Sequence, residues 1–512
     1  MNRYSIRRLL LVAATLLLAR PVPAQDLLKA APGYARYQAL SHGLTNDAGL
    51  NAVSVTWREE GKSFDYSNGG KRLHFDIASQ TTTAATNSAS GGEGRRRSGE
   101  DSGRRSRPPA PGRGRQYSNA TSPDGKWKAF YRERNLWLSE TNNTNAVALT
   151  TDGNQTNRVK NGSASWVYGE ELRQSTAIWW SSNSQKVAFY RFDESKVRDY
   201  YLTLDLTNLQ SREFAEAYPK AGTTNPLVDV LVYDLPSKRT VKLDVRDGQP
   251  FDNDTIGHYV YGIAWSPDSR EVLFHRTNRK QNIQEFCAGD PETGKCRVII
   301  REEWPQSWVE NLLPFQFLKD GQRFLWASDR SGWRNYYLYN LKGELLGTVT
   351  DQKSDCGDIV HVDEDAGQVY YQARTGDNPL KLQLHRVGLD GKNDERLTDP
   401  AFHHTIDFAP DGKHFIDVAQ THDFPPSTCL RDNQGHLLSE LRHGDLAEFK
   451  KQKLRSVELF KFKAADGQTD LYGMLHFPSR FSSWKKYPLL VTVYAGPETS
   501  GAHETFTIPN AL

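Results

Sequence analysis

The sequence predicts a mainly β protein, a multi-bladed β-propeller followed by the beginning of an α/β domain. Three observations support this fold class: a recurring turn-and-strand pattern, alternating strands between Pro-Asp-Gly turns, and one nearly continuous apolar run near the C-terminal end. The copies are spaced at roughly 45–85 residues, which fits a four-stranded blade better than a single hairpin. A β-sandwich is the alternative, and the pattern does not fix the number of blades.

Each copy of the repeat has an aromatic or polar entry, a turn such as Ser-Pro-Asp-Gly and then a β-rich run. The copies begin at Thr121, Trp180, Trp265, Phe317 and Phe408, with a looser copy near residue 365. Several continue into a second strand, as in RNLWLSE and RNYYLYNLKGELL. Because radial repetition protects the edges of such sheets, we expect a β-propeller over residues 117–454.

The first 24 residues read as a secretory signal peptide. A positively charged start (MNRYSIRR) precedes the apolar run Leu9–Ala19, and a small-residue cleavage site ends at Ala24. A retained membrane anchor is less favoured, since Arg20 and Pro21 end the apolar run early. The sequence therefore predicts an exported bacterial protein, secreted or periplasmic, with no membrane segment after cleavage.

Residues 25–80 and 81–116 differ sharply in composition. The first segment contains VSVTWREEGKSFDYSNGGKRLHFDI, which reads as a β-meander and a candidate first blade. The second is rich in Thr, Ser, Gly, Arg and Pro and has almost no large apolar side chains, so we expect a disordered loop. An arginine-rich arm for RNA is the less favoured interpretation, because aromatic residues are not interleaved with its arginines.

The charge balance does not favour a nucleic-acid partner. The formal net charge is +3, and removing the four positive charges of the signal peptide and the net five of the Arg-rich loop leaves −6. A nucleic-acid-binding protein would need a basic face.

The four cysteines suggest a disulfide rather than a metal site. Cys287 and Cys296 flank the turn-rich segment DPETG, so a disulfide across a hairpin is predicted in an oxidising compartment. Cys356 and Cys429 either pair or remain free. No CxxC pair is present, so we expect no structural zinc. We also expect no other metal and no cofactor.

The character of the sequence changes at about Arg455. SVELFKFKAADGQTDLYGMLHFPSRF predicts a β-hairpin, and Pro488–Tyr494 is a nearly continuous apolar run. Such a run is typical of a strand buried on both faces, so the segment 455–512 is interpreted as the start of a parallel α/β sheet.

Two adjacent carboxylates stand in an aromatic segment, WVYGEELRQSTAIWW. Glu170 and Glu171 follow Tyr168 and precede the pair Trp179–Trp180. A solvated turn is the simpler interpretation, because glutamate is seldom buried unless paired. The functional hypothesis is that the pair faces a cavity and binds a cation there.

The sequence resembles the dipeptidyl peptidase IV branch of the prolyl oligopeptidase family of serine peptidases. The resemblance rests on WVYGEEL, FYRFDESKV, AYPKAGTTNPLVDV and YPLLVTVYAGP, and it runs from about Tyr117 to about Phe506. The Arg-rich loop has no counterpart in the family pattern. The combination of motifs is specific, whereas each alone is weak.

The resemblance implies an α/β-hydrolase domain with a Ser-Asp-His triad, covered by the propeller. It implies that Glu170 and Glu171 bind the free α-ammonium of a peptide, so that dipeptides are released, preferentially after Pro or Ala. By the same resemblance Tyr494 donates to the oxyanion and Arg132 orients the substrate carbonyl; a surface arginine and a packed tyrosine are the alternatives. Homodimerisation through the hydrolase domain of the full-length protein is also implied.

The sequence contains no Gly-x-Ser-x-Gly nucleophile elbow, and by the family's order the triad would follow Leu512. We therefore expect the chain as written to be truncated and without hydrolytic activity. A non-catalytic periplasmic propeller that binds peptides or protein partners is the alternative. A relative of the acylaminoacyl type is less favoured, since a blocked N-terminus needs no paired carboxylates.

Overall fold

The predicted mainly β fold is confirmed by the computed structural model of the protein. The structure describes residues 50–85, 110–142, 145–451, 454–478, 481–494, 496 and 499–507, together with 29–30, 34–35 and 38. Within these residues it contains seven sheets of the blade type and two separate hairpins. The predicted signal peptide lies outside the described residues.

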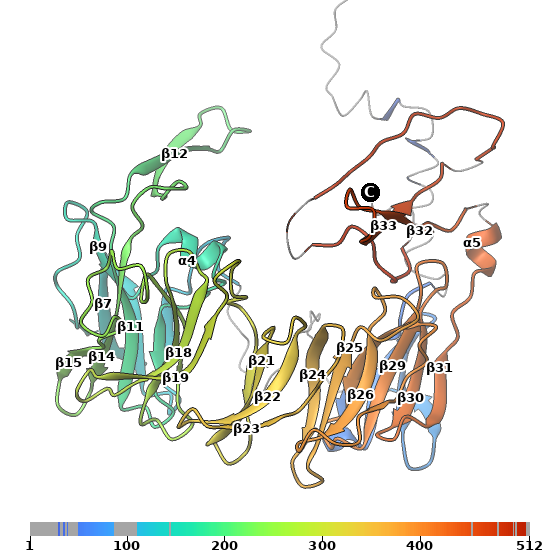
Figure 1. Ribbon diagram of the computed structural model, residues 1–512, viewed down its shortest axis with the longest axis horizontal. Helices are drawn as coiled ribbons and strands as arrows, with labels where there is room; N and C mark the ends of the chain where they lie inside the picture. The colour runs from blue at the N-terminus through green and yellow to red at the C-terminus, as the bar shows by residue number, and fades with distance from the viewer. Residues whose placement is uncertain are drawn as a thin grey trace, which may run out of the picture.

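Three sheets form the N-terminal half of the propeller region. Their strands are β1 (Val55–Arg58), β2 (Ser63–Asn68), β3 (Lys71–Asp76) and β4 (Thr81–Ala84); β5 (Asn119–Thr121), β6 (Trp127–Arg132), β7 (Asn135–Glu140) and β8 (Ala146–Ala148); and β9 (Val159–Asn161), β10 (Ile178–Trp180), β11 (Lys186–Asp193), β14 (Leu227–Asp234) and β15 (Arg239–Lys242). The 3-10 helix η1 (Glu59–Gly61) joins β1 to β2. The hairpin of β12 (Asp199–Leu204) and β13 (Arg212–Ala217) projects from the third sheet (Figure 1).

Four further sheets complete the propeller region, each with antiparallel neighbours in sequence order. Their strands are β16 (Tyr259–Trp265), β17 (Val272–Thr277), β18 (Ile283–Gly289) and β19 (Cys296–Glu303); β20 (Phe315–Phe317), β21 (Arg323–Ser328), β22 (Asn335–Asn340) and β23 (Leu345–Thr348); β24 (Cys356–Asp363), β25 (Gln368–Ala373), β26 (Gln383–Gly388) and β27 (Glu395–Arg396); and β28 (His403–Phe408), β29 (His414–Gln420), β30 (Ser427–Asp432) and β31 (Leu437–Arg442). The helix α5 (Ala447–Lys451) follows β31.

The predicted turn of the repeat joins the first strand of a sheet to the second. In the β5–β6 turn the Ser122 hydroxyl donates to the Asp124 carboxylate at 2.6 Å, and in the β16–β17 turn Ser266 donates to Asp268 at 2.7 Å. Aspartate accepts such local bonds readily, which holds the chain in the turn between the two strands.

Two tryptophans of the repeat join their own sheet to the preceding one. The indole of Trp180 donates to the carbonyl of Ala120 in β5 at 3.0 Å, and that of Trp265 donates to the carbonyl of Trp179 in β10 at 3.0 Å. An indole brings a large apolar area and one donor, so one residue type both packs and fixes the distance between neighbouring first strands.

Apolar clusters lie between successive sheets and hold them in an arc. Buried side chains of β5–β8 pack with those of β10–β11, and further clusters continue pairwise to β28–β31. The N-terminal sheet β1–β4 packs against β29–β31 through Phe64, Phe75, Ile416 and Leu430. Figure 1 shows this order, with the blue N-terminal sheet beside the orange sheet β28–β31. Burial of these apolar faces is the main stabilising contribution to the arc.

The ends of the segment predicted to be a disordered loop are ordered. Residues 81–84 form β4, which pairs with β3, and residues 110–116 pack beside the helix α4 (Trp166–Glu170). Residues 86–109 lie outside the described residues. Among the described residues, no helix combines the length and the apolar character needed to cross a bilayer.

The disulfide predicted between Cys287 and Cys296 is not formed in the structure, in which all four cysteines are free thiols. The strand register gives the reason. Cys287 in β18 pairs with Val298, whereas Cys296 in β19 pairs with Gly289, so the two cysteines are not opposite each other. Burial raises the pKa of the Cys296 thiol to about 12, which keeps it protonated and unreactive.

The segment after α5 contains the predicted hairpin but not the predicted buried strand. β32 (Glu458–Lys463) pairs with β33 (Asp470–Leu475). Residues 488–494 form no strand, and Leu490 is 87% exposed. A strand that is apolar on both faces needs sheet neighbours on both edges, and the described residues supply none for this segment.

Residues 499–507 are nevertheless fixed on the propeller by a buried carboxylate. Glu504 accepts hydrogen bonds from the ring and backbone nitrogens of His422 at 2.6 and 3.1 Å and from Asn378 at 2.6 Å. Lys381 lies 3.7 Å away. Burial alone would raise the pKa of Glu504, but the bonds from His422 and Asn378 outweigh it and lower the pKa to about 2. The hydrogen bond to Glu504 raises the pKa of His422.

We expect residues 499–507 to be held most strongly on the propeller between about pH 4.5 and 6.5. The stabilisation that comes from the ionised Glu504 carboxylate is complete above its ordinary pKa of 4.5 and is lost as the pH falls toward 2. The stabilisation that comes from the charged His422 ring is complete below its ordinary pKa of 6.5 and is lost as the pH rises through its raised pKa. Hydrogen-exchange protection factors of residues 499–507 across pH would measure this. In the variant Glu504→Gln, the protection should no longer be highest between pH 4.5 and 6.5. Protection that does not change with pH in the unchanged chain would contradict the prediction.

Candidate functional site

The short helix α4 carries the carboxylate pair and is anchored to the sheets by its own buried residue Tyr168. The Tyr168 ring is 1% exposed and packs edge-on against Tyr190 and Phe192, with centroids 5.7 and 4.7 Å apart. Its hydroxyl accepts a hydrogen bond from the backbone nitrogen of Val260 at 3.1 Å. An aromatic ring with a satisfied hydroxyl fixes the helix to two neighbouring sheets, so the residues that follow it have a defined position.

The two glutamates have different environments. The Glu170 side chain is 13% exposed and forms an ion pair with the guanidinium of Arg113. That hydrogen bond from Arg113 lowers the pKa of Glu170. Glu171 is exposed at the C-terminal end of α4, and its charge contributes to raising the pKa of Arg113. A cation of the chain itself therefore already lies beside the pair.

Two glycines allow the segment with Arg113 to approach the helix. Gly169 lies between Tyr168 and Glu170, and a Cβ there would overlap the carbonyl of Gly114. Gly114 itself has φ +69°, and a Cβ on it would overlap the indole of Trp166. Gly169 thus leaves room for the backbone of the other segment, and Gly114 leaves room for the Trp166 side chain.

Hydrogen bonds hold the same segment in place. The Gln116 side chain donates to the carbonyl of Gln174 at 3.2 Å and accepts from the backbone nitrogen of Ala164 at 3.0 Å. The backbone nitrogen of Tyr117 donates to the carbonyl of Ser175 at 2.9 Å. These bonds lie on both sides of α4 in the sequence, so residues 113–117 and the helix form one unit.

The structure does not bring the other predicted site residues to the pair. Arg132, at the end of β6, stacks on Trp137, with its guanidinium carbon 3.5 Å from the ring centroid. Tyr494 is 77% exposed in the segment after β33. In Figure 1, α4 and the hairpin β32–β33 both lie above the arc of sheets, at its two ends.

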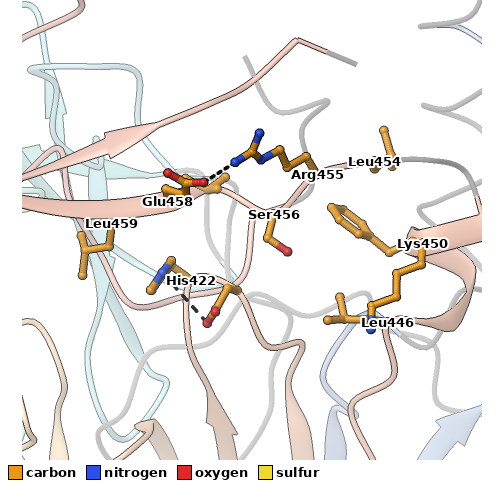
Figure 2. A pocket seen from close by; sticks show the side chains of 11 residues that line it. His422, Leu446, Lys450, Leu454, Arg455, Ser456, Glu458 and Leu459 are labelled. Atoms are coloured by element: carbon orange, nitrogen blue, oxygen red, sulfur yellow. Dashed lines mark hydrogen bonds and ion pairs between the residues drawn. The ribbon is translucent and has the colours of Figure 1, made fainter. Parts of the chain in front are cut away.

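Two cavities lie near the predicted functional elements, and neither is lined by Glu170 or Glu171. The first, of about 430 Å³, lies between the β29–β30 loop, the helix α5 and the start of β32 (Figure 2). His422, Lys450, Arg455 and Glu458 are among its lining residues, and Arg455 pairs with Glu458 at 2.6 Å. The second, of about 450 Å³, is lined on one side by residues 115–118. These two cavities do not test the expectation that both glutamates face a cavity, and it stays a prediction.

Sequence reasoning missed Arg113 and Gly114. Both stand in the motif GRGRQ, at the end of a segment interpreted as disordered because of its composition. The available signal was the alternation of glycine and arginine just before Tyr117, where the family resemblance begins. The described residues contain no cluster of three or more His, Cys, Asp or Glu side chains suited to a metal ion.

Comparison with known proteins identifies relatives over most of the chain. Residues 98–426 match the family model of the dipeptidyl peptidase IV N-terminal region. A probable dipeptidyl peptidase 4 of Arthroderma benhamiae is 26% identical over 406 residues, covering 76% of this chain and 50% of the relative. A dipeptidyl peptidase 4 of Trichophyton rubrum is also 26% identical, covering 76% of this chain and 51% of the relative. The chain thus spans about half the length of the curated relatives it matches.

Solved structures share the fold. The Porphyromonas gingivalis dipeptidyl peptidase 4 superposes with a TM-score of 0.63 at 21% identity, covering 89% of this chain and 59% of that protein. A putative dipeptidyl aminopeptidase IV from Bacteroides ovatus gives 0.62 at 22% identity, covering 92% and 63%. The arrangement of sheets is therefore one found in solved bacterial proteins.

Proposed function

Because the chain belongs to the dipeptidyl peptidase IV family, whose N-terminal region it matches over residues 98–426, we propose that it is part of an exported serine exopeptidase that removes dipeptides from peptide N-termini. In this proposal the chain supplies the residues that bind the N-terminus of the substrate. The Ser-Asp-His triad belongs to a hydrolase domain of which residues 455–512 are the beginning. The relatives are named as dipeptidyl peptidases, which supports a peptidase of this type.

One observation carries the proposal: a cationic side chain lies against the carboxylate pair at the end of α4. The Arg113 guanidinium contacts Glu170 while Glu171 remains exposed. A peptide α-ammonium has a pKa near 8 and is largely charged at neutral pH. It brings three donors, and Glu171 together with the unused lone pairs of Glu170 offers acceptors for them. Charge-assisted hydrogen bonds of this kind are about twice as strong as neutral ones.

Binding of the N-terminus at one position sets which peptide bond is cleaved. If the ammonium is held at α4, only the bond after the second residue reaches a nucleophile at a fixed distance, so dipeptides are released. We propose that Tyr494 donates to the oxyanion once the sheet of the hydrolase domain is complete; such a donor is typically worth about 10²–10³ in rate. The proposed preference for Pro or Ala at the second position, and homodimerisation of the whole protein, follow from the family alone.

The arginine that contacts the substrate carbonyl is proposed to be Arg113, with Arg132 as the second candidate. Arg113 already lies at the glutamate pair, and its side chain is 82% exposed, so it has a free face for a ligand. Arg132 is held over Trp137 and would have to leave that stacking contact to reach a substrate.

Calorimetry with two matched ligands tests ammonium capture in this chain. Alanyl-prolinamide, which has a free N-terminus and no carboxylate, should bind, and N-acetyl-alanyl-prolinamide should not. Acetylation removes the charge and two of the donors while leaving both side chains unchanged. Equal affinity for the two ligands, or no binding of either, would refute the proposal. Binding of the free form without hydrolysis by a chain joined to its complete hydrolase domain would favour a non-catalytic peptide-binding propeller.

A further inference from the structure

Arg113 stands in a tight turn, and the shape of that turn decides whether its guanidinium reaches Glu170. The backbone nitrogen of Arg115 donates to the carbonyl of Gly112 at 2.9 Å and closes the turn. Gly114, at the third position, has φ +69°, which is typical of a type II turn. Arg113 therefore occupies the second position, between two glycines that have no side chain with which to hold the turn in place.

Arg115, the last residue of the turn, has its side-chain partners in the strand β13. Its Nη2 lies 2.5 Å from a carboxylate oxygen of Glu216, and its guanidinium carbon lies 5.3 Å from the centroid of the Phe214 ring. The Glu216 side chain is 8% exposed, whereas that of Arg115 is 43% exposed. The carboxylate is thus held by the strand, and the arginine reaches it from the surface.

The strand β13 has a defined position relative to α4. It pairs with β12 along its whole length, with Glu216 opposite Tyr200. Tyr218, just after β13, lies 5.4 Å from Trp166 of α4 and 5.8 Å from Tyr200, measured between ring centroids. Figure 1 shows this hairpin above the arc of sheets, at the same end as α4. Glu216 and the pair Glu170–Glu171 therefore belong to elements that contact each other through aromatic rings.

The two arginines of the turn each take a carboxylate from a different element. Arg113 pairs with Glu170 of α4, and Arg115 pairs with Glu216 of β13. Among the described residues, Glu216 has no second ion pair. A pair between exposed groups contributes little, but the loss of Arg115 would leave a largely buried carboxylate unpaired, which is unfavourable. The pair of Arg115 with Glu216 is therefore suited to fixing the end of the turn.

We propose that Glu216 is a positioning residue, which holds Arg115 and thereby keeps Arg113 at the glutamate pair of α4. This inference rests on the proposed function, in which Arg113 contacts the carbonyl of the bound peptide. A contact that is fixed before the ligand arrives binds more tightly than one that must be ordered on binding, because the ordering cost is avoided. Without Glu216 the charge of Arg113 remains, but its position at the site is no longer fixed.

Hydrogen exchange in the purified chain tests the positioning role without any ligand. In Glu216→Gln the amide of Arg115, which closes the turn, should lose protection, while the amide of Glu171, which donates to Val167 in α4, should keep it. Arg115→Gln should have the same effect, and it changes a half-exposed side chain if the buried position 216 does not tolerate glutamine. An Arg115 amide that is unprotected in the unchanged chain, or equally protected in Glu216→Gln, would overturn the inference.

Calorimetry with alanyl-prolinamide measures the consequence for the site. Glu216→Gln should weaken binding by roughly 2–10-fold, within the range found for residues of one charged network. Arg113→Gln should weaken binding at least as much, and adding Glu216→Gln to it should have no further effect, because a positioning residue acts only through the residue that it positions. A loss that persists in the Arg113→Gln background would show that Glu216 acts through its own charge or through the fold, and would overturn the inference.

A matched control comes from the same strand. Glu213→Gln removes the same charge at an exposed position of β13 and should leave both the exchange of the Arg115 amide and the affinity unchanged. The two measurements also separate this inference from the proposed function. If the unchanged chain does not bind alanyl-prolinamide, the proposed function fails, while the exchange of the Arg115 amide in Glu216→Gln still decides whether Glu216 holds the turn.

Discussion

Replacement of Glu171 by glutamine is expected to weaken binding of alanyl-prolinamide by roughly 10–150-fold. The change removes the exposed carboxylate of the pair and keeps the shape of the side chain. Hydrogen bonds to charged groups contribute about 1.5–3 kcal/mol each, which corresponds to this range of affinity. Calorimetry at pH 7 and low salt measures the effect, and added salt should weaken binding to the unchanged chain, because Glu171 is exposed to solvent.

The partner variant and the control separate the roles of the two carboxylates. Glu170→Gln should also weaken binding, because Arg113 loses its partner and is free to pair with Glu171 instead. Glu213→Gln, an exposed glutamate of β13, is the matched control and should have no effect. An affinity of Glu171→Gln within twofold of the unchanged chain would show that the pair does not bind the ammonium.

Gly169→Ala is expected to displace the segment with Arg113 from α4. The new Cβ would overlap the backbone carbonyl of Gly114, which cannot move aside as a flexible side chain does. Overpacking costs about 1–3 kcal/mol, whereas alanine gains up to about 1 kcal/mol over glycine in a helix. We therefore expect a lower unfolding midpoint, together with faster hydrogen exchange in residues 112–117.

The control for this change is Gly347→Ala in β23. A Cβ at Gly347 meets no atom within 4 Å, and its φ is not positive, so the midpoint should stay the same or rise slightly. Unchanged exchange in residues 112–117 of Gly169→Ala would mean that the close approach of the two glycines is not needed to hold Arg113.

Much of the propeller was predictable because its signals are local. The Ser-Pro-Asp-Gly turns, the entry tryptophans and the period-2 strands each depend on neighbouring residues, and the structure has turns and strands at those positions. The hairpin β32–β33 was predicted for the same reason. The strand at 488–494 was predicted from composition alone, and it is absent because a doubly buried strand depends on neighbours from other parts of a sheet.

The site was only half predictable. The sequence by itself determined the position of the pair Glu170–Glu171, because the pair stands within one short motif, but not the anchoring role of Tyr168. Only the tertiary structure decided that Arg113, 57 residues away, meets Glu170 and that Arg132 stacks on Trp137 instead. It also decided the register that keeps Cys287 and Cys296 from facing each other. The physical reason is the same in each case. Side-chain type and local periodicity can be read from neighbouring residues, whereas charge pairing and strand register depend on which distant segments the fold brings together.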